Sequence, residues 1–331
     1  MMGSSEFNAK SWANDIHSGD RRALAKAITL IESSLAEDRL KAHKLLTEIL
    51  PFTGNSYRVG ISGPPGVGKS TFIEAFGNLL LSKNHKLAVL AVDPSSPVSG
   101  GSILGDKTRM QKLAMNDHAF IRPSPSGGML GGVSRRTRET MLLCEAAGYQ
   151  WIFVETVGVG QSEVLVRHMV DVFMTLQIPN SGDELQGIKK GILELADLVI
   201  VNKHDGEHKL IAEQSANFLN HALHLVRGRE QFAPQVLCVS SLHNTGIEDV
   251  LSVLEALIKK LTMTGDRDRR RMSQREQWFK DELLEILRDR LQKYTERDKS
   301  WDKTHDELRL SQIVPSVAAH TILEKVLVNL S

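Results

Sequence analysis

A glycine-rich segment between an apolar run and a helical stretch carries the clearest chemistry in this sequence. The apolar run covers residues 57–61, and the helical stretch begins at Thr71. A strand, a tight loop and a helix in this order point backbone N–H groups and a helix N-terminus at one place, which suits a phosphate group. Lys69 would reach the outer phosphates, and the Ser70 hydroxyl would ligate the Mg²⁺ that accompanies a nucleoside triphosphate. We therefore expect a P-loop formed by Gly63, Pro64, Pro65, Gly66, Val67, Gly68, Lys69, Ser70 and Thr71.

The segment Asn202-Lys203-His204-Asp205 predicts which base the nucleotide carries. It follows the apolar run 198–201, which is typical of a buried parallel strand, so it lies at the strand end where α/β sheets place ligands. A carboxylate at Asp205 can accept hydrogen bonds from the ring N–H and the exocyclic amine of guanine, whereas adenine would leave that charge unpaired. The predicted guanine site comprises Asn202, Lys203 and Asp205, with a backbone cover over the guanine carbonyl oxygen from Ser240, Ser241 and Leu242.

Acidic side chains between these two motifs predict a magnesium site. Glu155 follows the apolar run 151–154, and Asp93 follows the apolar run 86–92. Asp106 lies farther along in a glycine-rich loop. Mg²⁺ prefers oxygen ligands and keeps several waters, so Glu155 can hold the ion directly or through water, although GTPases usually carry aspartate at this position. The expected metal ligands are Ser70, Asp93, Asp106 and Glu155, while a solvated loop position is the alternative for each acid.

Gly158 and Val159, which follow Glu155 in the sequence, bear on the rate of hydrolysis. The N–H of Gly158 could sense the γ-phosphate of a bound nucleotide. Val159 stands where many GTPases carry the glutamine that orients the attacking water. We therefore expect slow hydrolysis by the protein alone.

Three longer stretches resemble the MeaB/ArgK group of G3E P-loop GTPases, which includes the mitochondrial protein linked to methylmalonic aciduria type A. They are AVDPSSPVSGGSILGDKTRM at 91–110, ETVGVGQSE at 155–163 and GDELQGIKKGILELADL at 182–198. The resemblance runs from about Asp15 to the C-terminus. It implies a GTPase chaperone of adenosylcobalamin-dependent methylmalonyl-CoA mutase or of a related acyl-CoA mutase. GTP, GDP and Mg²⁺ are the ligands expected for such a protein.

The resemblance also implies roles for single residues and an assembly. Asp93, Asp106 and Glu155 become metal-site or switch carboxylates, and Gln186 and Lys189 belong to an additional switch loop that can approach the nucleotide. A homodimer built partly from the C-terminal tail is implied as well. The candidate catalytic residues are then Lys69, Asp106, Glu155, Gln186 and Lys189.

Two other functions stay open from the sequence. A kinase of a basic amino-acid transport system, an older label of this group, would need a site for a second phosphoryl acceptor, and we find no residues that indicate one. A metal-insertion metallochaperone would need a soft or imidazole-rich site. The histidine pairs 204/208 and 221/224 stand without a clustered cysteine, which favours surface histidines. Arginines 135, 136 and 138 could neutralise charge near a γ-phosphate, although a role on a helix surface is favoured.

The hydrophobic pattern divides the chain into three zones: an N-terminal helical arm (1–55), a P-loop GTPase core (56–262) and a C-terminal helical dimerisation extension (263–331). Apolar runs alternate with helical patterns across the core, which predicts an α/β fold of the P-loop NTPase type, with a doubly wound, mostly parallel sheet and helical extensions. The run Arg267–Arg271 is expected on a solvated helix face. An apolar stripe, for which internal packing and self-association both stay open, is formed by Trp278, Phe279, Leu283, Leu284, Leu287 and Leu291.

Composition narrows the class of protein. The 331 residues carry a net charge of +1, which gives no electrostatic reason to expect a nucleic acid or an anionic membrane as partner. No apolar stretch approaches the roughly 20 residues of a membrane span. The two cysteines, Cys144 and Cys238, are expected in the core of a protein from a reducing compartment. We expect the cytoplasm, or the mitochondrial matrix if a presequence has been removed.

Overall fold

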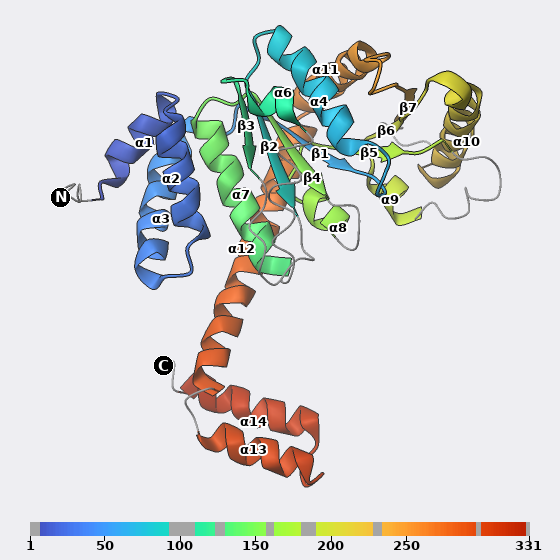
Figure 1. Cartoon of the computed structure of the whole chain (residues 1–331). Coiled ribbons are helices and arrows are strands. Elements are labelled where there is room, and N and C mark those ends of the chain that lie inside the picture. The colour runs from blue at the N-terminus through green and yellow to red at the C-terminus, as the bar shows by residue number, and fades with distance from the viewer. Residues whose placement is uncertain are drawn as a thin grey trace. The chain divides into compact units, whose positions relative to one another are not determined.

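The structure is a computed structural model that describes residues 7–92, 110–122, 130–156, 162–179, 190–227, 234–295 and 299–328. The chain divides into two compact units, residues 1–274 and 275–331. The first unit contains the sheet and the helices packed on it (Figure 1). The predicted sequence boundary at 262/263 lies twelve residues before the division between the units.

A seven-stranded sheet forms the centre of the first unit, and its described pairings are all parallel. The strand order is β3-β2-β4-β1-β5-β6-β7 (Figure 1). The inner strands are apolar and buried on both faces, as a parallel sheet covered by helices requires. The predicted doubly wound α/β fold is confirmed. The strands are β1 (Tyr57–Ser62), β2 (Leu87–Val92), β3 (Ala119–Arg122), β4 (Trp151–Thr156), β5 (Val172–Gln177), β6 (Leu198–Val201) and β7 (Gln235–Cys238).

Helices cover both faces of this sheet. One face packs against α1 (Ala9–His17), α2 (Arg21–Glu32), α3 (Ala36–Ile49), α7 (Leu130–Ala146) and α8 (Ser162–Arg167). The other face packs against α4 (Lys69–Ser82), α6 (Gln111–Ala114) and α11 (Ile247–Met263). Around β6 and β7 lie α9 (Lys190–Leu195) and α10 (Lys209–Arg227), and two short 3₁₀ turns are η1 (Leu50–Phe52) and η3 (Gly206–His208). The N-terminal helices thus share one hydrophobic core with the sheet (Figure 1).

The two cysteines lie within this first unit as free thiols. Cys144 on α7 is fully buried, and burial raises the pKa of its thiol. Cys238 at the end of β7 is half-buried, and burial raises its pKa as well. A raised pKa disfavours the thiolate, which is the reactive form of a cysteine.

The first turns of α12 (Asp266–Thr295) belong to the first unit, and their arginines bind its backbone and buried acids. The Arg271 guanidinium donates from Nε and Nη2 to the two carboxylate oxygens of Asp171, both at 2.6 Å, and from Nη1 and Nη2 to the carbonyl oxygens of Gly54 and Ser56, also at 2.6 Å. Arg271 is only 8% exposed. The expectation of a solvated helix face is therefore wrong for Arg267, Arg270 and Arg271, because the buried Asp171 and Asp197 just before β5 and β6 bind them. Arg269 in the same run is exposed.

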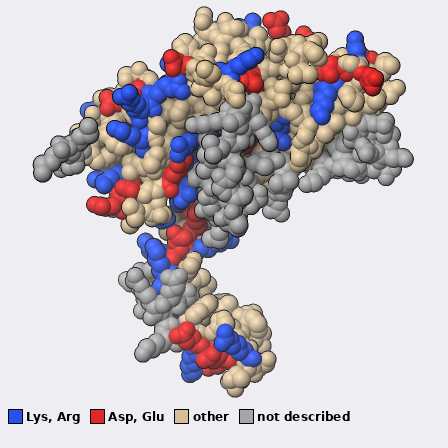
Figure 2. Space-filling model, in the orientation of Figure 1, with Lys and Arg blue, Asp and Glu red and all other residues tan. Residues whose placement is uncertain are grey.

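The second unit comprises the rest of α12 with α13 (Lys299–Arg309) and α14 (Pro315–Val328). Much of the predicted apolar stripe on α12 is exposed, since Phe279 is 69% and Leu284 is 56% accessible. Packing among the described residues therefore does not cover the stripe. Among those residues, no helix is long and apolar enough to cross a membrane. Figure 2 shows basic and acidic side chains interspersed over the face in view, in keeping with a net charge of +1.

Candidate functional site

The loop between β1 and α4 has the backbone geometry that a P-loop needs. Gly63 and Gly68 adopt φ values of 154° and 91°, which L-residues with a side chain rarely adopt. A Cβ at Gly63 would stand 2.7 Å from the Leu176 carbonyl oxygen, and a Cβ at Gly68 would stand 2.7 Å from Asn202 Nδ2. Both glycines therefore let the loop pass close to its neighbours before α4 begins at Lys69.

Lys69 lies folded against this loop. Its Nζ donates to the carbonyl oxygens of Gly63 at 2.7 Å and Pro64 at 3.3 Å. Burial lowers the pKa of the Lys69 ammonium, while the negative charges of Glu155 and Glu163 oppose that shift. The ammonium is thus held beside the helix N-terminus together with two carboxylates, which is the arrangement expected where triphosphate and metal meet.

Asn202, directly after β6, joins three segments of the site. Its Nδ2 donates to the Val67 carbonyl oxygen at 2.7 Å. Its Oδ1 accepts from Ser241 N at 3.1 Å and from Ser241 Oγ at 2.7 Å. Asn202 is 2% exposed, so its amide connects the P-loop to the segment after β7 through buried hydrogen bonds. The sequence placed Asn202 at the base, but this bridging contact is visible only in the fold.

The predicted base-reading residues lie together at the carboxyl ends of β6 and β7. Ser240 Oγ donates a hydrogen bond to Asp205 Oδ2, and Ser240 is fully buried. The backbone supports this placement, because His204 N donates to the Val239 carbonyl oxygen at 2.9 Å and Lys203 adopts a left-handed φ of 61°. Ser240 therefore fixes the orientation of the carboxylate that the guanine edge would meet.

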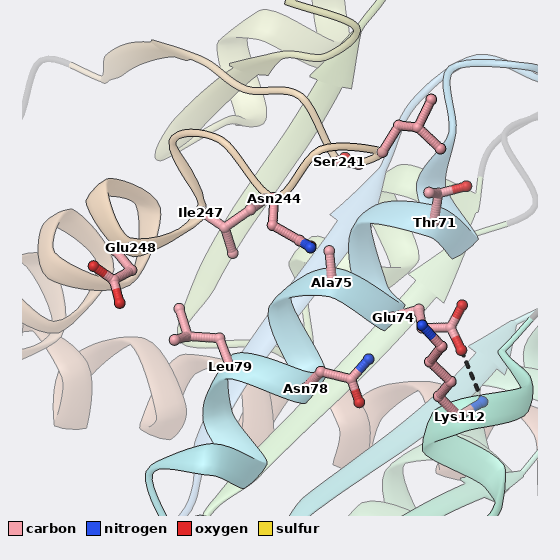
Figure 3. A pocket seen from close by; sticks show the side chains of 11 residues that line it. Thr71, Glu74, Ala75, Asn78, Leu79, Lys112, Ser241, Asn244, Ile247 and Glu248 are labelled. Atoms are coloured by element: carbon pink, nitrogen blue, oxygen red, sulfur yellow. Dashed lines mark hydrogen bonds between the residues drawn. The ribbon is translucent and has the colours of Figure 1, made fainter.

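A cavity of about 490 Å³ extends from this region along α4. Thr71 of the P-loop and Ser241 of the predicted base cover both lie in its lining (Figure 3). Leu242 lines it as well. Four further polar residues, which no motif in the sequence marked, also line the cavity. They are Glu74, whose Oε1 accepts from Lys112 N at 2.9 Å, with Asn78, Asn244 and Glu248.

Glu155 and Ser70 offer the oxygen ligands that Mg²⁺ prefers. Glu155 lies in β4, which runs between β1 and β2, and it pairs in register with Ile61 and Ala91. It is 8% exposed, and Ser70 lies in the first turn of α4. The donor set is therefore of the type that fits this ion. Outside the described residues lie Asp93, Asp106, Gly158, Val159, Gln186 and Lys189.

Two buried residues at the start of α8 escaped the sequence reasoning. Glu163 is 4% exposed and acts electrostatically on Lys69, and Ser162 is fully buried. Their signal in the sequence is position, because both belong to the stretch 155–163 that carries Glu155. On α7, Arg138 is 5% exposed, so the expected place on a helix surface is wrong for this arginine. Among the described residues, no three His, Cys, Asp or Glu side chains are grouped to hold a metal ion.

Comparison with known proteins places these features in context. The family profile described as "Methylmalonyl Co-A mutase-associated GTPase MeaB" matches residues 24–296. "Probable GTPase Rv1496" of Mycobacterium tuberculosis (strain ATCC 25618 / H37Rv) is 48% identical over 313 residues, which cover 94% of this chain and 93% of that protein. "GTPase ArgK" of Escherichia coli (strain K12) is 44% identical over 310 residues, which cover 93% and 94%.

A mitochondrial protein and a solved structure are similar as well. "Methylmalonic aciduria type A homolog, mitochondrial" of Mus musculus is 46% identical over 272 residues, covering 79% of this chain and 66% of that protein. The structure described as "Crystal structure of LAO/AO transport system kinase" has a TM-score of 0.76 and 36% identity, and the alignment covers 98% of this chain and 99% of that chain. The similarity therefore extends far beyond the P-loop.

Proposed function

Because this chain belongs to the family of methylmalonyl Co-A mutase-associated GTPases called MeaB, we propose that it is the GTP-dependent chaperone of an adenosylcobalamin-dependent methylmalonyl-CoA mutase. The chain is a GTPase, which hydrolyses GTP to GDP and phosphate. The observation that carries the mutase proposal is the family match over residues 24–296, which spans the whole sheet and all of α12. The mouse relative, named for methylmalonic aciduria type A, supports the same client.

Guanine recognition is assigned in this proposal to Asp205. Its carboxylate accepts from the ring N–H and the exocyclic amine of the base, and the hydrogen bond from Ser240 Oγ holds it in position. The backbone of Ser241 and Leu242 covers the guanine carbonyl oxygen. Adenine lacks the two donors, so the half-buried carboxylate would keep Ser240 Oγ as a partner but gain none from the base, at a cost on the order of a few kcal/mol.

The phosphates and the metal are assigned to the opposite end of the site. The P-loop amides and Lys69 hold the phosphates, and Ser70 with Glu155 holds Mg²⁺, together with Asp93 and Asp106. When bound, Mg²⁺ neutralises charge that develops on the phosphate oxygens. The buried position of Glu155 near Lys69 supports this assignment.

Hydrolysis is proposed to be slow until a client protein docks. Val159 offers no group that could orient the attacking water. Gly158 senses the γ-phosphate, and Gln186 and Lys189 supply the additional switch contacts. A chaperone needs a long-lived GTP state in order to wait for its client, and slow hydrolysis provides one.

Self-association through the second unit completes the proposal. The apolar stripe on α12 includes Phe279, Leu283, Leu284 and Leu287, each at least 45% exposed. A second copy of the chain would remove this area from water, which favours a homodimer. Sedimentation of the full chain, with Leu284→Lys as the matched disrupting variant, checks the assembly. Residence in the cytoplasm, or in the mitochondrial matrix, fits a mutase client.

A kinase is the second candidate, because the solved structure with 36% identity is described as a transport system kinase. The two functions differ in where the γ-phosphate goes. GTP labelled in the γ-phosphate should release label only as inorganic phosphate, and the protein loaded with a non-hydrolysable GTP analogue should retain the mutase from a lysate of its own organism. Label on a second molecule without mutase retention would contradict the chaperone proposal.

A further inference from the structure

The helix α8 begins beside the proposed phosphate site. Glu163 at its start is 4% exposed, and its charge opposes the lowering of the Lys69 pKa that burial causes. The neighbouring Ser162 hydroxyl is fully buried and finds no hydrogen-bond partner among the described residues. The start of α8 is therefore sensitive to the charge and the hydrogen-bonding groups placed beside Lys69.

The C-terminal half of α8 packs tightly on β1, the strand that leads into the P-loop. Gly60 in β1 has no Cβ, and one placed there would stand 2.8 Å from Val166 Cγ1 of α8 and 2.8 Å from Phe173 Cδ2. Val166 is fully buried. Because protein interiors are close-packed, a displacement of Val166 requires the whole of α8 to move.

The far end of α8 is held by the first turns of α12. Gln274 Nε2 donates to the Val170 carbonyl oxygen at 2.8 Å and to the Arg167 carbonyl oxygen at 3.4 Å. Arg270 donates from both terminal nitrogens to Asp197, at 3.1 and 3.2 Å, and Arg167 Nη2 reaches the same carboxylate at 3.4 Å. Gln274 thus contacts the last residue of α8 and the turn after it, and Arg270 shares the Asp197 carboxylate with Arg167.

The helix α8 is short, so its two ends are expected to move together. Six residues at 1.5 Å per residue span about 9 Å, which is less than two helical turns. We propose that α8 transmits the state of the nucleotide site to the start of α12, with Gln274 and Arg270 as positioning residues at the receiving end. The inference rests on the phosphate site proposed at Lys69 and Glu155, and it adds a route by which GTP can act on the C-terminal helix.

Backbone hydrogen exchange in residues 266–274 tests this route. The full chain is compared with GDP and with a non-hydrolysable GTP analogue, both at saturation. We expect exchange rates in this segment to differ by about fivefold or more between the two nucleotides, the lower end of typical coupling between sites. Gln274→Met keeps the side-chain volume but removes the donor, so the difference should fall below about twofold.

Two further variants distinguish coupling from loss of structure. Gln277→Met is the matched control, because Gln277 is exposed and its Nε2 donates to Asp281 on the surface of the same helix, and it should behave as wild type. Gln274→Lys restores a donor and should restore the nucleotide-dependent difference. Should Gln274→Met fail to fold, Arg270→Lys provides the same comparison, because it loses the two-pronged contact with Asp197 but keeps its charge.

The outcomes separate this inference from the function on which it rests. Retention of the full nucleotide-dependent difference in Gln274→Met, or its absence in a wild-type protein that binds both nucleotides, would overturn the α8 route and leave the proposed site intact. Failure of the wild-type protein to bind GTP in a calorimetric titration would instead overturn the proposed phosphate site, and the route with it.

Discussion

Replacement of Asn202 by alanine should separate the phosphate half of the site from the base half. The side chain is 2% exposed and makes buried hydrogen bonds to Val67 O at 2.7 Å, Ser241 N at 3.1 Å and Ser241 Oγ at 2.7 Å. The Ser241 hydroxyl can rotate toward another acceptor, but the Val67 carbonyl and the Ser241 amide cannot. Leaving each of these two backbone groups without a partner costs about 1–3 kcal/mol.

We therefore expect Asn202→Ala to weaken the binding free energy of a nucleotide by about 3 kcal/mol. At about 1.4 kcal/mol per tenfold, this corresponds to a loss of affinity of about a hundredfold. Isothermal titration with GDP and with a GTP analogue measures the loss, which should be similar for both nucleotides because the bridge supports base and phosphates together. Asn202→Asp keeps the acceptor for Ser241 but sets an oxygen against the Val67 carbonyl, so it should also bind more weakly than wild type.

Asn217→Ala is the matched control, because Asn217 lies on the exposed face of α10. It should bind both nucleotides as wild type does. Affinities within about threefold of wild type for a correctly folded Asn202→Ala protein would refute the reasoning, because that corresponds to less than about 1 kcal/mol.

Three other outcomes follow from the geometry. Asp205→Asn should weaken GTP and favour xanthine nucleotides, whose edge presents a carbonyl where guanine has an amine, and unchanged GTP affinity in calorimetry would remove Asp205 from the base site. Arg271→Ala should lower the free energy of unfolding in urea by about 3–5 kcal/mol because it leaves the buried Asp171 charge uncompensated, whereas exposed Arg269→Ala should cost less than about 1 kcal/mol. Burial alone would raise the pKa of Asp171, but the Arg271 side chain and the Arg58 N–H lower it below 3.8. The contribution of this carboxylate to the free energy of unfolding is therefore complete above that pH. It is lost as the pH falls through the lower pKa of the folded state. Thermal unfolding between about pH 5 and about pH 3 should show this loss in wild type and not in Asp171→Asn.

The sheet was predictable because its strands are continuous apolar runs. The run 198–201 coincides with β6, and the run 57–61 gives β1 except for Ser62. Strands buried on both faces leave such runs, and the polar or glycine-rich residues after them mark the ligand edge of the sheet. The P-loop could be placed for the same reason, since its glycines meet a backbone requirement that is local in sequence.

Contacts between distant segments could not be predicted. A charge run such as Arg267–Arg271 ordinarily faces solvent. The acids that bind it are far away in the sequence, because Asp171 precedes Arg271 by 100 residues and Asp197 precedes Arg270 by 73 residues. Only the parallel sheet, which gathers strand beginnings at one edge, brings these acids to α12. The bridge made by Asn202 likewise depends on the adjacency of two loops that no spacing in the sequence reveals.

The chaperone proposal is tested most directly by the rate of phosphate release from GTP. The rate is measured with and without purified adenosylcobalamin-dependent methylmalonyl-CoA mutase from the same organism. The free protein should turn over at roughly 10⁻⁴ to 10⁻² per second, the range of unassisted switch GTPases, and saturating mutase should accelerate it at least about tenfold. Because linkage is reciprocal, the mutase should change the affinity for GTP by the factor by which GTP changes the affinity for the mutase. No acceleration at saturating mutase, together with equal mutase affinity in the GDP and GTP-analogue states, would contradict the proposal.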